Sequence, residues 1–140
     1  MIRAWLCALC LVALPVAAAD HRLTAADEKA IHAVVKAQLD AFAHDDARKA
    51  FSYATSDIRD QFRDADIFMA MVRHSYAVVY RPASVSFLAV ALEYGEVLQP
   101  VRMTDAEGGV WVARYHMERQ PDGRWLIAGC DLARTAGSAI

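Results

Sequence analysis

The chain has 140 residues, with 15 Lys and Arg against 17 Asp and Glu, so its formal net charge is -2 at pH 7. That length suits one domain with a substantial hydrophobic core. The lack of a basic excess or a basic stripe argues against nucleic-acid binding.

The first 19 residues have the order of a secretory signal peptide. Arg3 precedes an apolar run over residues 4–14, Pro15 breaks the run, and small residues follow up to Ala19. The run is shorter than the roughly 20 residues that a membrane-spanning helix needs. We therefore expect cleavage after Ala19, a periplasmic or secreted mature domain over residues 20–140, and no membrane association after cleavage.

Cleavage would leave Cys130 as the one cysteine of the mature chain. A lone thiol in an oxidising compartment is either buried and inert or available for pairing between molecules. Cys130 lies between apolar neighbours in a strand-like run, which favours burial.

A long first helix is predicted over residues 25–43. Thr24 offers a capping hydroxyl, and acidic residues occupy the first turn. Asp45 or Asp46 can then accept the free N–H groups of a second helix that includes residues 50–54. The apolar residues that recur at helical spacing in the first helix are Ile31, Val34, Val35, Leu39 and Phe42.

Two more helical segments are expected before the pattern changes. Residues 56–62 form a short turn, and Asp64 caps a helix over residues 65–74. The apolar residues that this helix should bury are Ile67, Phe68, Met71 and Val72.

After Tyr76 the sequence alternates polar and apolar residues, as strands do. Pro82 should mark the start of a long first strand, because proline cannot donate a ladder hydrogen bond. Tyr94-Gly95 is the expected turn to the second strand. The remaining segments are a loop over residues 105–109, a third strand over 110–119, a turn over 120–123 and a closing strand over 124–132. The order predicts an α+β fold with N-terminal helices packed on a curved antiparallel sheet.

The faces of the last two strands follow from the alternation of their side chains. The residues of the third strand that should face the helices are Trp111, Ala113, Tyr115 and Met117, and those that should face solvent include Arg114, His116 and Glu118. Residues 125–130 are apolar on both faces. Such a strand is either central in its sheet or meets a second copy of the chain, so a homodimer is one of two open alternatives.

No metal or cofactor is expected. His116 and Glu118 share a strand face, but two residues are too few for a metal site and Arg114 is a ready charge partner. The motifs G-x-S-x-G, G-x-x-x-x-G-K and G-x-G-x-x-G are missing, which argues against serine hydrolases and nucleotide chemistry. Acid-base lyases and isomerases remain open, because they need no linear motif.

Candidate ligand-binding residues gather where the helices give way to the sheet. Tyr53, His74, Tyr76 and Tyr80 lie there, and tyrosine combines an apolar body with a polar tip. Trp111 and Tyr115, on the covered face of the third strand, complete the candidate set. The alternative is that the tyrosines only fill space and bond to backbone carbonyls. His74 is the best candidate for a general base, although a histidine at a helix C-terminus is also favoured by the helix dipole alone.

Three runs of the sequence carry a resemblance to a family: AVVKAQLDAFAHDDARKAFSYATSDIRDQF, FMAMVRHSYAVVYRPASVSF and GGVWVARYHMERQPDGRWLIAGCDL. Together they resemble the short exported proteobacterial proteins grouped as domain of unknown function 4864. That family is similar to the nuclear-transport-factor-2-like superfamily, in which helices and a curved sheet form a cone.

The resemblance implies a range of functions. The superfamily includes ketosteroid isomerases, dehydratases, polyketide cyclases and non-catalytic binding or dimerisation modules. The acid-base residues of its isomerases have no matching motif in this chain. We therefore expect a non-catalytic domain that binds a small apolar ligand or dimerises. The alternatives are a cofactor-free lyase or isomerase that uses His74 with Tyr53 or Tyr115, and a partner-binding module whose cone is filled by side chains.

Overall fold

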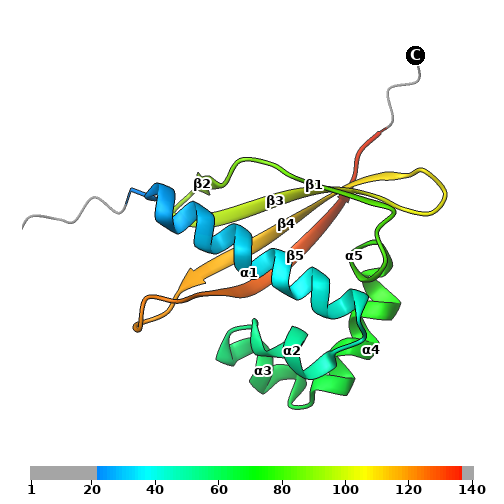
Figure 1. Cartoon of the computed structure of the whole chain (residues 1–140), viewed down its shortest axis with the longest axis horizontal. Coiled ribbons are helices and arrows are strands. Elements are labelled where there is room, and N and C mark those ends of the chain that lie inside the picture. Colours follow the sequence, from blue (N-terminus) through cyan, green and yellow to red (C-terminus); the bar gives the residue numbers. More distant parts are fainter. Residues whose placement is uncertain (1–21, 137–140) are drawn as a thin grey trace, which may run out of the picture.

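The computed structural model describes residues 22–136, so the expected signal peptide lies outside the described residues. The described range begins with helices and ends with strands. Its elements are α1 (Ala25–Ala43), α2 (Ala47–Ser52), α3 (Ser56–Phe62), α4 (Ala65–Ser75), α5 (Ala77–Tyr80), β1 (Ser84–Phe87), β2 (Ala91–Glu93), β3 (Glu96–Thr104), β4 (Val110–Arg119) and β5 (Trp125–Arg134). Helices followed by a curved, open antiparallel sheet make this an α+β fold, as predicted (Figure 1).

The helices begin where capping side chains can accept backbone N–H groups. At the start of α1, the Thr24 hydroxyl accepts the N–H of Asp27 at 3.1 Å, and the Asp27 carboxylate accepts the N–H of Thr24 at 3.0 Å. Asp46 caps α2 through the N–H of Lys49 at 3.1 Å. Asp64 caps α4 through the N–H of Asp66 at 2.7 Å. The predicted starts of these three helices are confirmed.

The buried face of α4 differs from the predicted one. Phe68, Met69 and Val72 are buried, whereas the side chain of Ile67 is 58 % exposed, so its predicted burial was wrong. Residues at positions i, i+1 and i+4 of a helix share one side, and the residue before them points away. Met71 lies between the two sides and is half-buried. The one-turn helix α5 was not predicted.

The sheet has the strand order β1-β3-β4-β5, and β2 also pairs with β3. The long first strand that was predicted is therefore two short strands, β1 and β2, with an interruption opposite Pro100. Pro100 has no N–H to offer at that point, although its carbonyl accepts the N–H of Leu88 at 3.0 Å. The side-chain amide of Gln99 supplies a donor instead, bonding to the Leu88 carbonyl at 2.8 Å.

A β-bulge reverses the faces of β5. His116 pairs with Gly129 while Met117 pairs with Ile127, which leaves Ala128 without a partner in β4. An extra residue shifts the alternation, so Ile127 before the bulge and Cys130 after it both face the helices. The predicted regular alternation was therefore wrong. Strand β5 is an edge strand of the sheet. An isolated parallel β-bridge joins its Ile127 to Ala54.

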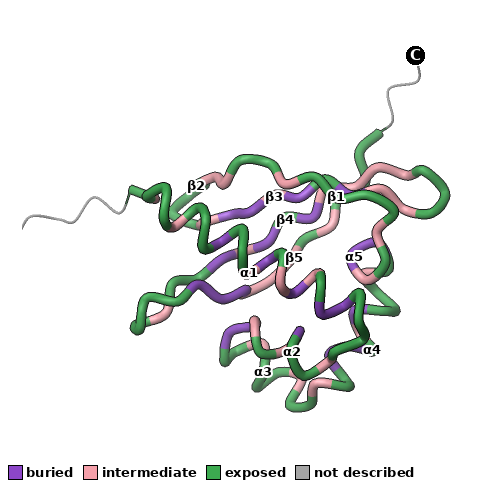
Figure 2. The backbone as a smooth tube through the Cα atoms, in the orientation of Figure 1, coloured by how far each residue is buried: buried purple, intermediate pink, exposed green. Residues whose placement is uncertain are grey.

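The main core lies between α1 and one face of the sheet, which we call the inner face (Figure 2). The helix packs on β3 and β5, and its residues Ile31, Val35 and Phe42 are almost completely buried. Helices α2 and α4 contact each other beyond the C-terminal end of α1, so they extend the core past one end of the sheet (Figure 1).

Candidate functional site

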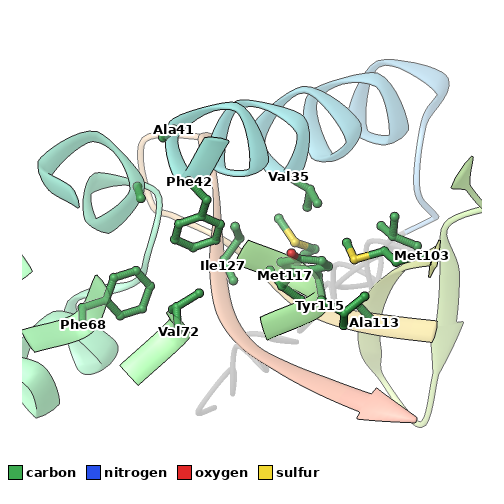
Figure 3. Packing of buried hydrophobic residues seen from close by; sticks show 14 of the residues in the cluster. Val35, Ala41, Phe42, Phe68, Val72, Met103, Ala113, Tyr115, Met117 and Ile127 are labelled. Atoms are coloured by element: carbon green, nitrogen blue, oxygen red, sulfur yellow. The ribbon is translucent and has the colours of Figure 1, made fainter. Parts of the chain in front are cut away.

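A cavity of about 1210 Å³ lies between the helices and the inner face of the sheet. Its lining extends along α1 from Asp27 to Phe42, a stretch of about 22 Å at the helical rise of 1.5 Å per residue. The apolar side chains of the lining include Phe42, Ile58, Phe62, Phe68, Met71, Val72, Val79, Val97, Met117 and Ile127. Figure 3 shows Phe42, Phe68, Val72 and Ile127 grouped around one end of this space. The cavity is therefore long and mainly apolar.

The local structure places these side chains by simple periodicity. Gln38 and Phe42 lie one helical turn apart on α1, as do Phe68 and Val72 on α4, so each pair points to one side. Tyr115 belongs to the alternate residues of β4 that face the helices. The cavity thus receives side chains from helices and strands that are far apart in the sequence.

Three polar side chains interrupt the apolar walls away from the rim. Gln38 is 3 % exposed, and its Nε2 donates to the carbonyl of Ala50 at 3.1 Å. The Tyr76 hydroxyl donates to the Cys130 carbonyl at 3.1 Å and thereby connects the end of α4 to the edge of β5. The third is Tyr115, which is 1 % exposed and whose hydroxyl has no hydrogen-bond partner within the described chain.

The titratable groups inside the cavity are held in their neutral forms. Burial raises the pKa of the Cys130 thiol to about 12, with a smaller contribution from Asp131. Burial likewise raises the pKa of the Tyr76 hydroxyl, and it raises that of Tyr115 well above the usual value. Cys130 is half-buried, so the expected burial is met only in part, and the raised pKa of its thiol makes it a poor nucleophile at neutral pH.

Charged residues are confined to the rim of the cavity. At the end near the β4–β5 turn, Arg119 lies 3.9 Å from Asp27. His116, which points to the outer side of β4, also borders the cavity and lies between Asp131 at 2.7 Å and Glu96 at 3.0 Å. The hydrogen bond to Asp131, with that to Glu96, raises the pKa of His116 despite partial desolvation. The side chains of Arg119, Glu96 and Asp131 are exposed, whereas that of Asp27 is 14 % exposed and is held by its partners at the start of α1.

The family follows from a comparison with family models, which matches residues 24–140 to the family described as Domain of unknown function (DUF4864). The chain belongs to the DUF4864 family. No curated protein and no solved structure matches it. The resemblance inferred from the sequence motifs is therefore confirmed at the level of the family, whose description assigns no activity.

The DUF4864 structure places two of the six candidate residues in the cavity. Tyr76 and Tyr115 both contribute to its lining. Tyr53 lies outside the lining, at the C-terminal end of α2, where its carbonyl accepts the N–H of Ile127 at 2.8 Å. His74 is exposed on the last turn of α4 and also lies outside the lining.

The remaining two candidates make contacts elsewhere. The Tyr80 hydroxyl donates to the Asp45 carboxylate, and the guanidinium of Arg81 lies 4.2 Å from the centre of the Tyr80 ring. The indole Nε1 of Trp111 donates to Asp105 at 2.8 Å. Both side chains thus fix loops, and the structure does not bring them together with Tyr76 and Tyr115.

Sequence reasoning missed the helical contribution to the cavity. The sequence predicts Phe42 on the apolar side of the first helix and Phe68 and Val72 as core, and it does not single out Gln38. One signal was available, because Gln38 is a polar residue on the apolar side of α1, one turn before Phe42. A buried amide among apolar residues is a common mark of a polar contact in a binding site.

The described part of the chain lacks two further kinds of feature, a cluster of metal ligands and a membrane-spanning helix. Within residues 22–136, no group of three or more His, Cys, Asp or Glu side chains is placed to hold a metal ion. In the same range, no helix combines the length and apolar character required to cross a bilayer.

Proposed function

We propose that this DUF4864 protein is an exported, non-catalytic domain that binds an elongated, largely apolar molecule in the cavity under α1. The observation that carries the proposal is the cavity of about 1210 Å³, whose walls are mainly apolar and whose charges lie at the rim. Small-molecule sites are typically concave, mostly apolar spaces of about 300–1,000 Å³ with a few placed polar groups. This cavity exceeds that volume range, and it has the mainly apolar walls and the few polar groups of such a site.

Membership of the nuclear-transport-factor-2-like superfamily is part of the proposal. The order of helices before an antiparallel sheet and the cavity between them support it. Export is supported by the order of charged, apolar and small residues in the first 19 positions. Both inferences fit a carrier or sensor of a small molecule outside the cytoplasm.

Binding is preferred to catalysis because of the groups that line the cavity. The lyase or isomerase alternative requires an acid-base group beside the bound molecule. His74, the expected base, is exposed and lies outside the lining, and the enclosed Cys130 thiol has a pKa of about 12. Tyr76 and Tyr115 have raised pKa values and act as hydrogen-bonding groups at neutral pH.

The proposal also includes a homodimer formed through the outer face of the sheet, which is the face opposite α1. Val112 is half-buried on that face between Arg102 and Ala133, and Arg114 and Asp131 pair two residues away, whereas Leu98 and Leu126 on the same face are already buried. A surface of mixed charges and apolar residues can be complementary to itself across a two-fold axis.

The experiment that tests ligand binding is native mass spectrometry of residues 20–140, with occupancy compared between the natural sequence and Val72→Phe. Val72 is 4 % exposed and lines the cavity, so a larger side chain there should occupy ligand space and reduce the bound fraction. The same change at Ile67, which is 58 % exposed on the same helix, is the matched control and should leave binding unchanged.

Uptake of the amphipathic dye 1-anilinonaphthalene-8-sulfonate, which fluoresces at apolar surfaces, provides a second measurement for protein that is purified without a bound molecule. We expect dye fluorescence with the natural sequence and with Ile67→Phe, and a lower signal with Val72→Phe. A clean unliganded mass together with no dye uptake would show that the cavity is not a binding site.

A further inference from the structure

The hydroxyl of Tyr115 is the polar group of the cavity that the fold leaves without a partner. The buried Gln38 bonds to the carbonyl of Ala50, and the half-buried Tyr76 bonds to that of Cys130. Tyr115 is 1 % exposed, and its oxygen is the buried side-chain polar atom that lacks a hydrogen bond among residues 22–136. Figure 3 shows this oxygen among apolar side chains between α1 and the sheet.

An unpaired hydroxyl in such a place requires an explanation. Most buried polar groups in proteins are hydrogen-bonded, because a buried donor without an acceptor loses its hydrogen bond to water and forms no other. A phenylalanine would fill the same space without this cost. The position of Tyr115 in the wall of the cavity therefore points to an acceptor that comes with the bound molecule.

The protonation state of Tyr115 defines what the acceptor can be. Burial raises the pKa of its hydroxyl well above the usual value, so the group remains an O–H donor. Three cationic side chains border the cavity: Arg22, which is exposed before the start of α1, and His116 and Arg119 on β4. Arg119 lies four residues along β4, about 14 Å away at the strand rise, and His116 faces the outer side of the sheet. A carboxylate beside Tyr115 would be a buried charge without a counter-ion, which is strongly disfavoured.

We propose that the molecule bound by this protein carries a neutral carbonyl oxygen in its buried section, and that this oxygen accepts a hydrogen bond from the Tyr115 hydroxyl. The inference rests on the proposed binding function and specifies the ligand class. Met117 follows two residues later on the same face of β4 and also lines the cavity. Its flexible side chain can shift to admit the oxygen to the enclosed hydroxyl.

The test uses two probes that differ in one atom group, 2-acetylnaphthalene and 2-isopropenylnaphthalene. The first has a carbonyl oxygen where the second has a CH₂ group, so their shapes match. Dissociation constants are measured by fluorescence for the natural sequence, for Tyr115→Phe and for Tyr76→Phe. Tyr76→Phe is the matched control, because that tyrosine lines the same cavity but its hydroxyl already has a protein partner.

We expect Tyr115→Phe to weaken binding of the ketone about five- to tenfold relative to the alkene, the effect of one lost hydrogen bond. Tyr76→Phe should leave the ratio of the two dissociation constants unchanged. If both probes bind and the ratio is the same in all three proteins, the carbonyl inference is overturned while the binding function stands. If neither probe binds the natural sequence, both are overturned.

Thermal unfolding without ligand gives an independent readout. Tyr115→Phe should unfold at the same temperature as the natural sequence or at a higher one, because the change removes an unpaired buried group. Tyr76→Phe should unfold at a lower temperature, because it loses the bond to Cys130. A clear loss of stability in Tyr115→Phe would show that the hydroxyl serves the fold, which would overturn the inference.

Discussion

At the scale of single residues, the hydroxyl groups of Tyr80 and Tyr115 differ in whether the fold supplies a partner. Tyr80 donates to Asp45, a residue in the left-handed backbone region at φ 52°, which also accepts from Arg73 at 3.1 Å and from Arg81 at 3.0 Å. This cluster connects the end of α1 to α4 and α5. Tyr115 has no such partner, and that difference separates a structural tyrosine from a candidate ligand contact.

His116 is expected to titrate above its usual pKa of 6.5, because Asp131 and Glu96 both bond to its ring. A raised pKa in the folded state means that protonation stabilises the fold. This contribution is complete below the unfolded pKa and is lost as pH rises through the folded pKa. NMR titration of the ring protons should give a pKa above 6.5 for the natural sequence and a value nearer to 6.5 for Asp131→Asn.

Glu96→Gln is the control for this titration and should lower the pKa of His116 less than Asp131→Asn does, since the bond to Asp131 is the shorter of the two. Unfolding temperatures measured across the same pH range should show the same order of effects in the two variants. The stability lost in Asp131→Asn should be larger below pH 6.5 than above the folded pKa of His116. A His116 pKa at or below 6.5 in the natural sequence would contradict the prediction.

At the scale of helices and strands, the sequence was most informative where local chemistry decides the structure. Thr24, Asp46 and Asp64 mark helix starts because a short polar side chain satisfies free backbone N–H groups at those points. The break opposite Pro100 and the bulge at Ala128 could not be predicted in the same way. Both depend on which strand lies alongside, and pairing partners are set by tertiary structure.

The N-terminal cap of α1 provides a prediction at this scale. Thr24→Ala removes the hydroxyl that accepts the N–H of Asp27, so the free energy of unfolding should fall by about 1 kcal/mol. Thr24→Ser keeps the hydroxyl and should behave like the natural sequence. Chemical denaturation monitored by circular dichroism measures both variants. Equal stability of Thr24→Ala and Thr24→Ser would mean that the cap contributes nothing.

At the scale of the whole molecule, the candidate site shows the limit of sequence reasoning. Tyr76 and Tyr115 could be identified because each lies at a recognisable place, the end of a helix and the covered face of a strand. The apolar residues opposite them could not be distinguished from ordinary core. A core residue and a cavity-lining residue have the same periodicity, and they differ only in whether the space beside them is filled.

The outer face of the sheet carries the last prediction. Val112 is half-buried there, opposite Arg102 and Ala133, so a charge at this position would be buried in a dimer but solvated in a monomer. Val112→Glu should therefore shift the proposed dimer towards monomer without loss of the fold. Light scattering after size exclusion, at several concentrations, measures the shift.

Ile67→Glu, at an exposed apolar position on α4, is the matched control and should remain dimeric. A natural sequence that is monomeric at every concentration would refute the dimer, and dissociation by Ile67→Glu alone would place the interface on the helices.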